Sequence, residues 1–231
     1  TGYYSDISIT SFYGMHMINC AGNGGMITTN NKKFYEKCML LRSWGRSSSL
    51  FSDSENIENR FNVYLDNIRY DAKFIFEKVG YMMEPSELGS AFGLEQLKKL
   101  KNTLKKRDMA AKSHISFFSK YKNWFHLPVM EENCKSYWFA FPLIVKPEAP
   151  FNRTDMQIFL EKRNIQTRVI FTGNALRQPA FKNIKKVVAK DGYPIADEIM
   201  KNGILLACHH GLTEDMQEHL YASLKEFFNK F

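Results

Sequence analysis

Long apolar runs, paired cysteines and a basic leader are all missing from this sequence. No apolar stretch in its 231 residues approaches the roughly 18 residues that span a bilayer. No basic segment leading into an apolar one opens the chain, so no secretory signal is expected. The four cysteines form no CxxC pair, which argues against a disulfide scaffold and a zinc site. We therefore expect a cytoplasmic protein with no metal site and no membrane partner.

Basic residues are absent from the first 31 positions, although the chain as a whole is basic. Lysine and arginine number 32 against 24 aspartate and glutamate residues, which gives a net charge of +8. The densest basic run, 98–107, has the spacing of one helix face, so the charge is diffuse. We expect a solvated basic surface with some residues left for a phosphate-bearing ligand, and we do not expect nucleic acid as a partner.

Hydrophobic periodicity predicts an α/β chain, and hydrophobic and charged contents of 44% and 24% are those of a globular protein. The predicted strands cover 7–12, 26–29, 137–145, 165–171 and 204–208. The predicted helices cover 32–43, about 86–118 with Pro85 in the first turn, 154–163, 196–201 and 214 onward, with caps at Asn30 or Asn31, Asn152 and Thr213. Residues 45–70 are polar and turn-rich, so we predict a loop-like insertion that is either functional or disordered.

Two motifs near the start carry the first chemical signal. Ser11-Phe12-Tyr13-Gly14-Met15-His16 is followed by Gly22-Asn23-Gly24-Gly25. Glycines let a backbone turn tightly beside a ligand, although any hairpin could use them. An imidazole, as His16 offers here, can serve as a base near neutral pH, although a lone histidine is more often a hydrogen-bonded core or loop residue.

With these motifs the chain resembles the DegT/DnrJ/EryC1/StrS family of sugar-modifying enzymes, which use pyridoxal phosphate on the fold-type I aminotransferase scaffold. The resemblance continues through 42–46, 80–81, 91–97, 165–168, 171–174 and 177–179. It implies the C-terminal portion of such a transferase, an α/β fold with a partial large-domain sheet. The remainder of the large domain would cover 1–85, a long linking helix 86–122 and a small α+β domain 123–231. We expect this fragment alone not to bind the cofactor productively, because the resemblance implies a further N-terminal half.

The resemblance also implies a particular reaction. In this family a lysine stands five residues after the serine of the first motif and binds the cofactor covalently. Here that position is His16, and no lysine precedes Lys32. The nucleotide-sugar 3-dehydratases are a branch with this same exchange. The implied activity is removal of the C3 hydroxyl of a nucleotide-linked 4-keto-6-deoxyhexose in deoxysugar biosynthesis for surface lipopolysaccharide. His16 would be the base and pyridoxamine phosphate the working cofactor, because an imidazole cannot form a Schiff base.

Further site residues follow from the same resemblance. The implied cofactor-binding residues are Ser11, at the phosphate, and Tyr13, Gly24 and Gly25, although Tyr13 is as plausible as a buried structural tyrosine. The implied substrate-binding residues are Arg168, Asn174, Arg177, His209 and His210. Arginine suits phosphate and carboxylate recognition, but a structural arginine bonded to loop carbonyls fits this stretch equally well. Adjacent histidines on an extended segment point to opposite sides, so a structural turn or a substrate contact is favoured over a metal site.

Two departures from the family pattern shape the expected partners. Met82 stands where the family has an asparagine that reaches the neighbouring subunit's cofactor phosphate. Ser47-Ser48-Ser49 stands where some 3-dehydratases have cysteines for an iron–sulfur cluster, so no iron–sulfur cluster is expected. The resemblance then implies a nucleotide-diphosphate sugar as substrate, an amino donor such as glutamate that recharges the cofactor, and a homodimer.

Three alternatives stay open at this point. One is a nucleotide-sugar aminotransferase that uses another lysine. A second is a non-catalytic relative that acts as a partner or regulatory subunit. The third, a nucleic-acid-binding module, would be excluded by a flat salt response in DNA binding.

Overall fold

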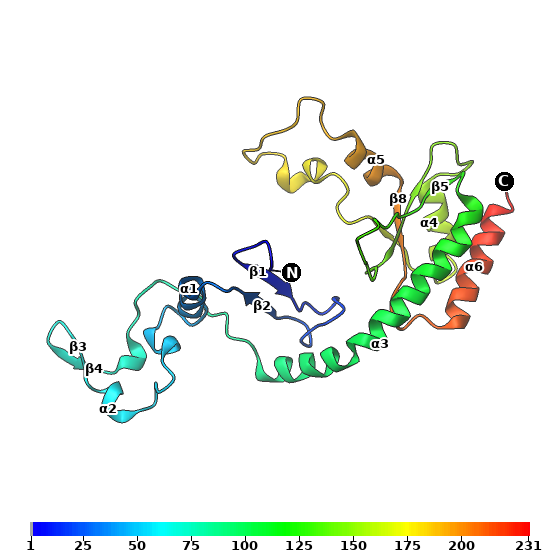
Figure 1. The fold of residues 1–231 in the computed structure, drawn as a ribbon. Coiled ribbons are helices and arrows are strands. Elements are labelled where there is room, and N and C mark those ends of the chain that lie inside the picture. The colour runs from blue at the N-terminus through cyan, green and yellow to red at the C-terminus, as the bar shows by residue number, and fades with distance from the viewer. Residues whose placement is uncertain (1) are drawn as a thin grey trace. The chain divides into compact units, whose positions relative to one another are not determined.

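The computed structural model describes residues 2–231 and separates two compact units, Thr1–Lys99 (unit 1) and Leu100–Phe231 (unit 2). Figure 1 follows the elements along the chain. The long helix α3 (Glu87–Phe118) contributes to both units, since the boundary between them falls inside it. This confirms the expected long helix, although Pro85 lies before its first turn. The division expected at residues 85 and 122 stays a prediction.

Unit 1 opens with a two-stranded antiparallel hairpin, which confirms both short strands expected there. Strand β1 (Ser8–Ser11) pairs with β2 (Gly25–Thr28). Ile9 lies opposite Ile27, and these side chains are 78% and 53% exposed. The hairpin therefore holds together through its backbone ladder rather than through a buried face.

Helix α1 (Lys32–Arg42) follows the hairpin, and the cap is Asn31 rather than Asn30. The side-chain oxygen of Asn31 accepts hydrogen bonds from the amides of Lys33 and Phe34. Two of the amides that a helix start leaves without backbone partners are thereby satisfied.

The expectation of a loop-like insertion over 45–70 is wrong. The segment forms the 3-10 helix η1 (Ser47–Leu50), the short helix α2 (Ile57–Arg60) and a hairpin of β3 (Val63–Leu65) and β4 (Ile68–Tyr70). The 3-10 helix η2 (Ala72–Phe74) follows it. Asp66 and Asn67 turn the hairpin with φ angles of +48° and +69°. Both residue types tolerate this left-handed backbone, which a two-residue hairpin turn requires.

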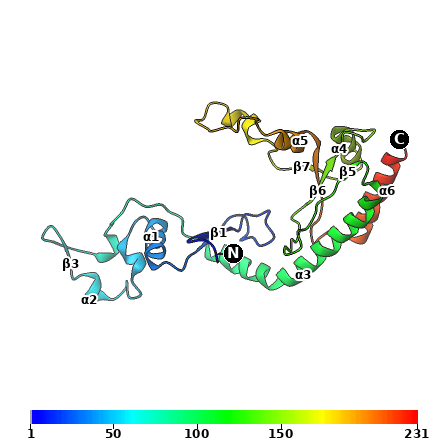
Figure 2. The ribbon, with the colours of Figure 1, turned by 45° about the horizontal axis from the view of Figure 1, so that its top comes forward.

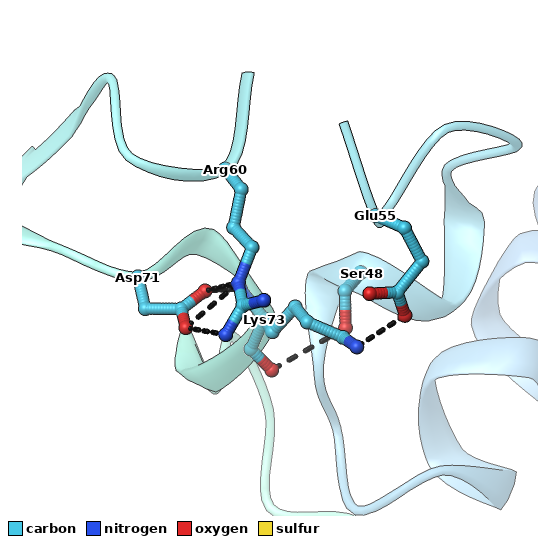
Figure 3. Close-up of polar contacts among 5 residues, drawn as sticks. All are labelled: Ser48, Glu55, Arg60, Asp71 and Lys73. Carbon is cyan, nitrogen blue, oxygen red and sulfur yellow. Dashed lines mark hydrogen bonds and ion pairs between the residues drawn. The ribbon is translucent and has the colours of Figure 1, made fainter. Parts of the chain in front are cut away.

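Polar contacts hold this segment in place, as Figure 3 shows. The Nε atom of Arg60 lies 2.8 and 2.9 Å from the two carboxylate oxygens of Asp71, and Lys73 pairs with Glu55. The hydroxyl of Ser48 donates to the carbonyl oxygen of Lys73 at 3.4 Å. Hydrogen bonding to Arg60 lowers the pKa of Asp71, and hydrogen bonding to Lys73 lowers the pKa of Glu55. The segment is therefore ordered by charge-assisted contacts.

Unit 2 is built on a four-stranded antiparallel sheet in the order β5-β6-β8-β7. Its strands are β5 (Phe125–His126), β6 (Phe141–Val145), β7 (Arg168–Val169) and β8 (Gly203–Leu206). Three of them confirm expected strands but are shorter than predicted. The two-residue β5 is too short for periodicity to reveal, so the sequence indicated only three strands here.

Three more helices complete unit 2. They are α4 (Arg153–Glu161), α5 (Pro194–Asn202) and α6 (Glu214–Phe228), all of which were expected. The predicted caps are confirmed: Asn152 accepts from the amide of Asp155, and Thr213 from that of Met216. Helix α6 lies along the second half of α3 in both views (Figures 1 and 2). Nowhere in residues 2–231 does the structure have a helix of the length and apolarity that a membrane crossing requires.

Aromatic and aliphatic side chains from the sheet and from α3, α4 and α6 form one core in unit 2. The largest fully buried ones are Phe118, Phe125, Phe141, Leu143, Met156, Leu160, Ile204, Leu206 and Leu224. At its edge the ring of Phe117 stacks on that of Tyr221 with 4.5 Å between centroids. This core fixes the sheet that carries Arg168 in β7 and leads into His209 and His210 after β8.

A fully buried histidine belongs to the same core. His114 Nε2 lies 2.8 Å from the carbonyl oxygen of Ala207, and Nδ1 lies 2.9 Å from the hydroxyl of Tyr221. A carbonyl only accepts, so Nε2 carries the hydrogen and Nδ1 accepts from the hydroxyl. Burial lowers the pKa of His114, which holds the ring neutral.

Candidate functional site

The loop that carries His16 is a continuation of the β1–β2 hairpin. The amide of Phe12 donates to the carbonyl oxygen of Gly24 at 2.9 Å, and the amide of Gly14 donates to that of Gly22 at 2.8 Å. The amide of Cys20 returns to the carbonyl oxygen of Phe12 at 3.0 Å. Residues 12–24 therefore form a closed loop with a defined backbone.

His16 is oriented by the strand end that precedes it. Its amide donates to the carbonyl oxygen of Tyr13 at 2.9 Å, and its Nδ1 lies 3.1 Å from the carbonyl oxygen of Ser11. Because a carbonyl only accepts, Nδ1 carries a hydrogen. The rings of Tyr13 and His16 meet edge to face at 5.8 Å. The structure thus brings Ser11, Tyr13 and His16 together, and it leaves Tyr13 55% exposed rather than buried.

The other two candidates in this loop lie at its closing end. Gly25 pairs with Ser11 across the hairpin. Gly24 has a φ angle of +145°, and a Cβ there would lie 3.1 Å from the Cβ of Cys20. A side chain at Gly24 would therefore meet both backbone strain and crowding, so the local backbone geometry explains why glycine stands at this position.

Two of the stretches that carry the resemblance, 42–46 and 80–81, meet in space. The amide of Trp44 donates to the carbonyl oxygen of Tyr81 at 2.9 Å, and the amide of Tyr81 donates to that of Leu41 at 2.7 Å. A Cβ on Gly45 would overlap the carbonyl oxygen of Lys78, and one on Gly80 would overlap the amide nitrogen of Gly45. The two backbones cross in direct contact, and only glycine fits at either position.

The two departures noted in the sequence also have places in this crossing. Met82 forms a bridge with Ser43 and is 65% exposed. Ser47, Ser48 and Ser49 each direct their hydroxyl to a backbone carbonyl oxygen, of Ile75, Lys73 and Arg46 respectively. Ser47 and Ser48 therefore hold the η1 turn against the segment around Lys73 and Ile75, and Ser49 closes the turn on Arg46.

In unit 2, Asn174 and Arg177 converge on a carboxylate that the sequence analysis did not single out. The Nδ2 of Asn174 donates to Asp197 at 2.8 Å, and Arg177 makes a two-pronged ion pair with it, with Nη2 at 2.6 Å. These bonds, that of Arg177 first, lower the pKa of Asp197 to about 2. The sequence signal that could have drawn attention to Asp197 is its place as an acidic residue in the first turn of α5, but its two partners lie about 20 residues away in the sequence.

The remaining candidates of unit 2 are more separate. Arg168 is exposed and donates to the carbonyl oxygen of Thr167 at 2.7 Å. His209 Nδ1 accepts from the amide of Gly211 at 3.2 Å, and His210 is exposed. Partial burial and the charge of Arg107 lower the pKa of both histidines, so both are neutral near neutral pH.

Arg107 itself is a second residue that the sequence analysis missed. It is 4% exposed, and its Nη1 donates to the carbonyl oxygens of Trp138, Phe139 and Cys208 at 2.9–3.1 Å. These contacts tie helix α3 to the segment before β6 and to the segment after β8 that leads into His209. In the described part of the chain, no three histidine, cysteine or acidic side chains gather as a metal site would require.

The hairpin with its closed loop, the long helix and the small antiparallel sheet have the aminotransferase-type fold of PLP-dependent enzymes, over about half the length of the solved relatives. A sequence profile of the DegT/DnrJ/EryC1/StrS aminotransferase family matches residues 1–225, and the chain belongs to this family.

Named relatives narrow the comparison. The chain is 30% identical over its whole length to dTDP-4-dehydro-2,6-dideoxy-D-glucose 3-dehydratase from Saccharopolyspora spinosa, of which it covers 50%. It is 29% identical to the lipopolysaccharide biosynthesis protein RfbH from Salmonella typhimurium, over 98% of this chain and 52% of that one. The solved structure of the E. coli GDP-4-keto-6-deoxy-D-mannose-3-dehydratase with bound hydrated PLP is 26% identical, with a TM-score of 0.75, over 97% of this chain and 55% of that one.

The chain thus spans about half the length of the curated relatives it matches. Proteins named as sugar transaminases or amino-sugar synthases match it as well, at 24–26% identity. The comparisons therefore agree with the expected fold and family, and with PLP as the cofactor of a solved relative. The matched relatives include proteins named as 3-dehydratases and proteins named as transaminases, which are the two reactions that the sequence left open.

Proposed function

We propose that this chain provides part of the site of a pyridoxamine-phosphate-dependent nucleotide-sugar 3-dehydratase, with His16 as the base. The observation that carries the proposal is the hydrogen bond between His16 Nδ1 and the carbonyl oxygen of Ser11. With the hydrogen of Nδ1 held by this carbonyl, Nε2 is the ring nitrogen that would take up the proton. The same carbonyl dipole faces the Nδ1 hydrogen and stabilises the positive charge that the ring then acquires. The relatives named as 3-dehydratases support this reaction.

The chemistry of the loop fits such a cofactor. The Oγ of Ser11 accepts from the amide of Tyr13 at 3.3 Å, so its own hydrogen can be donated to a phosphate oxygen. No lysine lies within 12–24 to hold the cofactor covalently, which suits the amine form. When bound, the cofactor supplies the electron sink for loss of the sugar C3 hydroxyl.

The proposed substrate is a nucleotide-linked 4-keto-6-deoxyhexose, with glutamate as the amino donor and a homodimer as the working form. Arg168 is our candidate for the diphosphate, because the residue is exposed and its guanidinium donates to the neighbouring carbonyl of Thr167. Arg177 has its fork on Asp197, so its proposed part is to orient the loop around Asn174. His209 and His210 are proposed to contact the sugar as neutral hydrogen-bonding groups. The product would serve lipopolysaccharide synthesis, as the name of the Salmonella relative suggests.

A sugar aminotransferase is the second candidate, since the family is described as an aminotransferase family and includes sugar transaminases. It requires a lysine other than one at position 16 to reach the cofactor. The two candidates therefore differ in whether borohydride can fix the cofactor to the protein.

The test takes the natural protein that contains this chain, loads it with pyridoxal phosphate, reduces it with borohydride and measures the intact mass. We expect no covalent adduct, and we expect glutamate to convert the bound cofactor to its amine form in the unreduced sample. The protein should then release the C3 hydroxyl of a 4-keto-6-deoxyhexose nucleotide. The variant His16→Asn should lose about 100-fold or more in kcat, the size of a general-base contribution.

His16→Lys is the matched control, because it restores the group that the family uses for covalent attachment. It should give the adduct and lose the dehydration. A stable lysine adduct in the wild type would overturn the dehydratase and favour the aminotransferase. Failure of the loaded wild type to act on any 4-keto sugar would favour a non-catalytic relative.

A further inference from the structure

The His16 loop lies against helix α3 at Cys20. The Cys20 amide holds the loop closed by donating to Phe12. On its other side Cys20 faces the first turns of α3, at Gly89 and Gly93. Cys20 thus lies between the hairpin and the helix, and all of these residues belong to unit 1.

A side chain at Gly93 or Gly89 would overlap Cys20 unless Cys20 moved. A Cβ on Gly93 would lie 2.6 Å from the Sγ of Cys20 and 3.6 Å from the carbonyl oxygen of Asn19. A Cβ on Gly89 would lie 2.9 Å from the carbonyl oxygen of Cys20. The two separations from Cys20, 2.6 and 2.9 Å, are below ordinary van der Waals contact, so the loop can lie this close because the helix has two glycines one turn apart. We call Gly89, Gly93 and Cys20 the loop seat.

The helix side of the loop seat is itself well defined. The Oγ of Ser86 accepts from the amide of Gly89 at 3.3 Å, and the carbonyl oxygen of Ser86 accepts from that of Ser90 at 2.9 Å. Ser86 therefore caps the helix directly beneath the seat. The glycines are presented by a regular first turn, not by a frayed end.

A short chain of bonds connects the loop seat to the base. Cys20 bonds to Phe12, the residue directly after Ser11, and the carbonyl oxygen of Ser11 holds Nδ1 of His16. A shift of Cys20 away from α3 pulls on Phe12 and so moves the carbonyl that fixes the imidazole. Through this chain of bonds, the position of Nε2 depends on Gly89 and Gly93 of the helix.

We propose that Gly89, Gly93 and Cys20 are positioning residues, which set the orientation of His16 by seating its loop on helix α3. This inference rests on the proposed function of His16 as the base. It adds a specific requirement: the helix must carry no side chain at the two positions that face Cys20.

Gly93→Ala and Gly89→Ala test the requirement, with Ser90→Ala on the same helix as the control. Histidine-labelled protein shows by NMR which ring nitrogen of His16 carries the hydrogen. Iodoacetamide modification followed by mass spectrometry gives the reactivity of the Cys20 thiol, with exposed Cys134 as the internal reference. We expect both glycine variants to lose the Nδ1–H signal of His16. Gly93→Ala should also raise the Cys20 modification rate about tenfold, because the thiol leaves the helix. Ser90→Ala should resemble the wild type in both.

Rescue separates the two glycines. The obstacle at Gly93 is the Sγ atom, so Cys20→Ala combined with Gly93→Ala should restore the His16 signal. The obstacle at Gly89 is a backbone oxygen, so Cys20→Ala should not rescue Gly89→Ala. In the loaded enzyme, Gly93→Ala should lower kcat by about 10- to 100-fold with little change in KM, as a displacement near 1 Å does.

The proposal is overturned if Gly93→Ala keeps the Nδ1–H signal of His16, or if Cys20→Ala rescues both glycine variants alike. Should Gly93→Ala fail to fold, Cys20→Leu enlarges the loop side of the same contact and must give the same loss of signal. The NMR and thiol measurements need no turnover, so a protein that is not a dehydratase still tests the loop seat. A working dehydratase that is indifferent to Gly93→Ala rejects the loop seat alone.

Discussion

Unit 2 packs eighteen hydrophobic residues into one buried core, whereas among the described residues of unit 1 Leu40 alone is hydrophobic and buried. Unit 1 instead relies on a backbone ladder at β1–β2, on the glycine crossing at Gly45 and Gly80, and on ion pairs such as Arg60 with Asp71. The proposed base lies in the unit without a core. The geometry of His16 therefore depends on a few specific close contacts, which single substitutions can remove. The sheet of unit 2 is instead stabilised by many apolar contacts that can replace one another.

The largest effect that sharpens this comparison is expected in the core of unit 2. Leu224→Ala removes a fully buried side chain, and the free energy of unfolding of unit 2 should fall by about 2–5 kcal/mol. Ile27→Ala in β2 should change stability by less than about 0.5 kcal/mol, because Ile27 is already 53% exposed. Urea denaturation followed by tryptophan fluorescence measures both. Equal losses in the two variants would break the contrast between the units.

A somewhat smaller effect is expected at the backbone crossing of unit 1. Gly45→Ala combines left-handed backbone strain, at a φ angle of +82°, with overlap on Lys78, and should cost about 2–4 kcal/mol. Hydrogen exchange should accelerate over 40–83 and stay unchanged over 203–228. Gly192→Ala is the matched control, because Gly192 has a φ angle of +68° but no neighbour within 4 Å of the added Cβ. If both variants behave alike, strain alone explains the loss and the crossing adds nothing.

The smallest effect concerns pH and the buried histidine of unit 2. The pKa of His114 is lowered by burial, so the unfolded chain binds this proton more readily than the folded one. Above the unfolded pKa of about 6.5 the histidine is neutral in both states, and the free energy of unfolding is unaffected by this group. As pH falls below that value, the unfolded chain takes up the proton first, and the free energy of unfolding falls by at most about 1.4 kcal/mol per pH unit. Urea midpoints between pH 8 and pH 5 measure the slope.

His114→Gln keeps hydrogen-bonding capacity and should flatten that slope, whereas His210→Gln should remove only a small part of it. The pKa of Asp197, lowered to about 2, acts in a separate window, since its contribution is lost as pH falls from about 4 toward 2. A slope that survives in His114→Gln would place the acid sensitivity of unit 2 elsewhere.

Local signals accounted for much of the fold. Asn31, Asn152 and Thr213 have side chains that cap helices, and each marked its helix correctly because capping depends on neighbours in sequence. The β3–β4 hairpin was missed because its strands are three residues long and its turn uses Asp66-Asn67 without glycine. Strand β5 was missed because two residues cannot show a period.

The candidate site was predictable in its residues but not in its contacts. The motif singled out Ser11 and His16, yet their hydrogen bond forms only when residues 12–24 close as a loop. Asp197 was overlooked because its partners Asn174 and Arg177 lie in a different element. Long-range polar pairing of this kind leaves no periodic mark in a sequence.

The loop seat also has a consequence for the local dynamics of α3. Glycine inside a helix is less stable than alanine by about 0.5–1 kcal/mol, so Gly89 and Gly93 make the start of α3 its least self-sufficient part. The packing of Cys20 compensates for that weakness while the loop is seated. When the loop lifts, the first two turns of the helix lose their support and unwind more readily. Loop release and helix fraying then become one cooperative opening, which couples the mobility of His16 to the melting of a helix end.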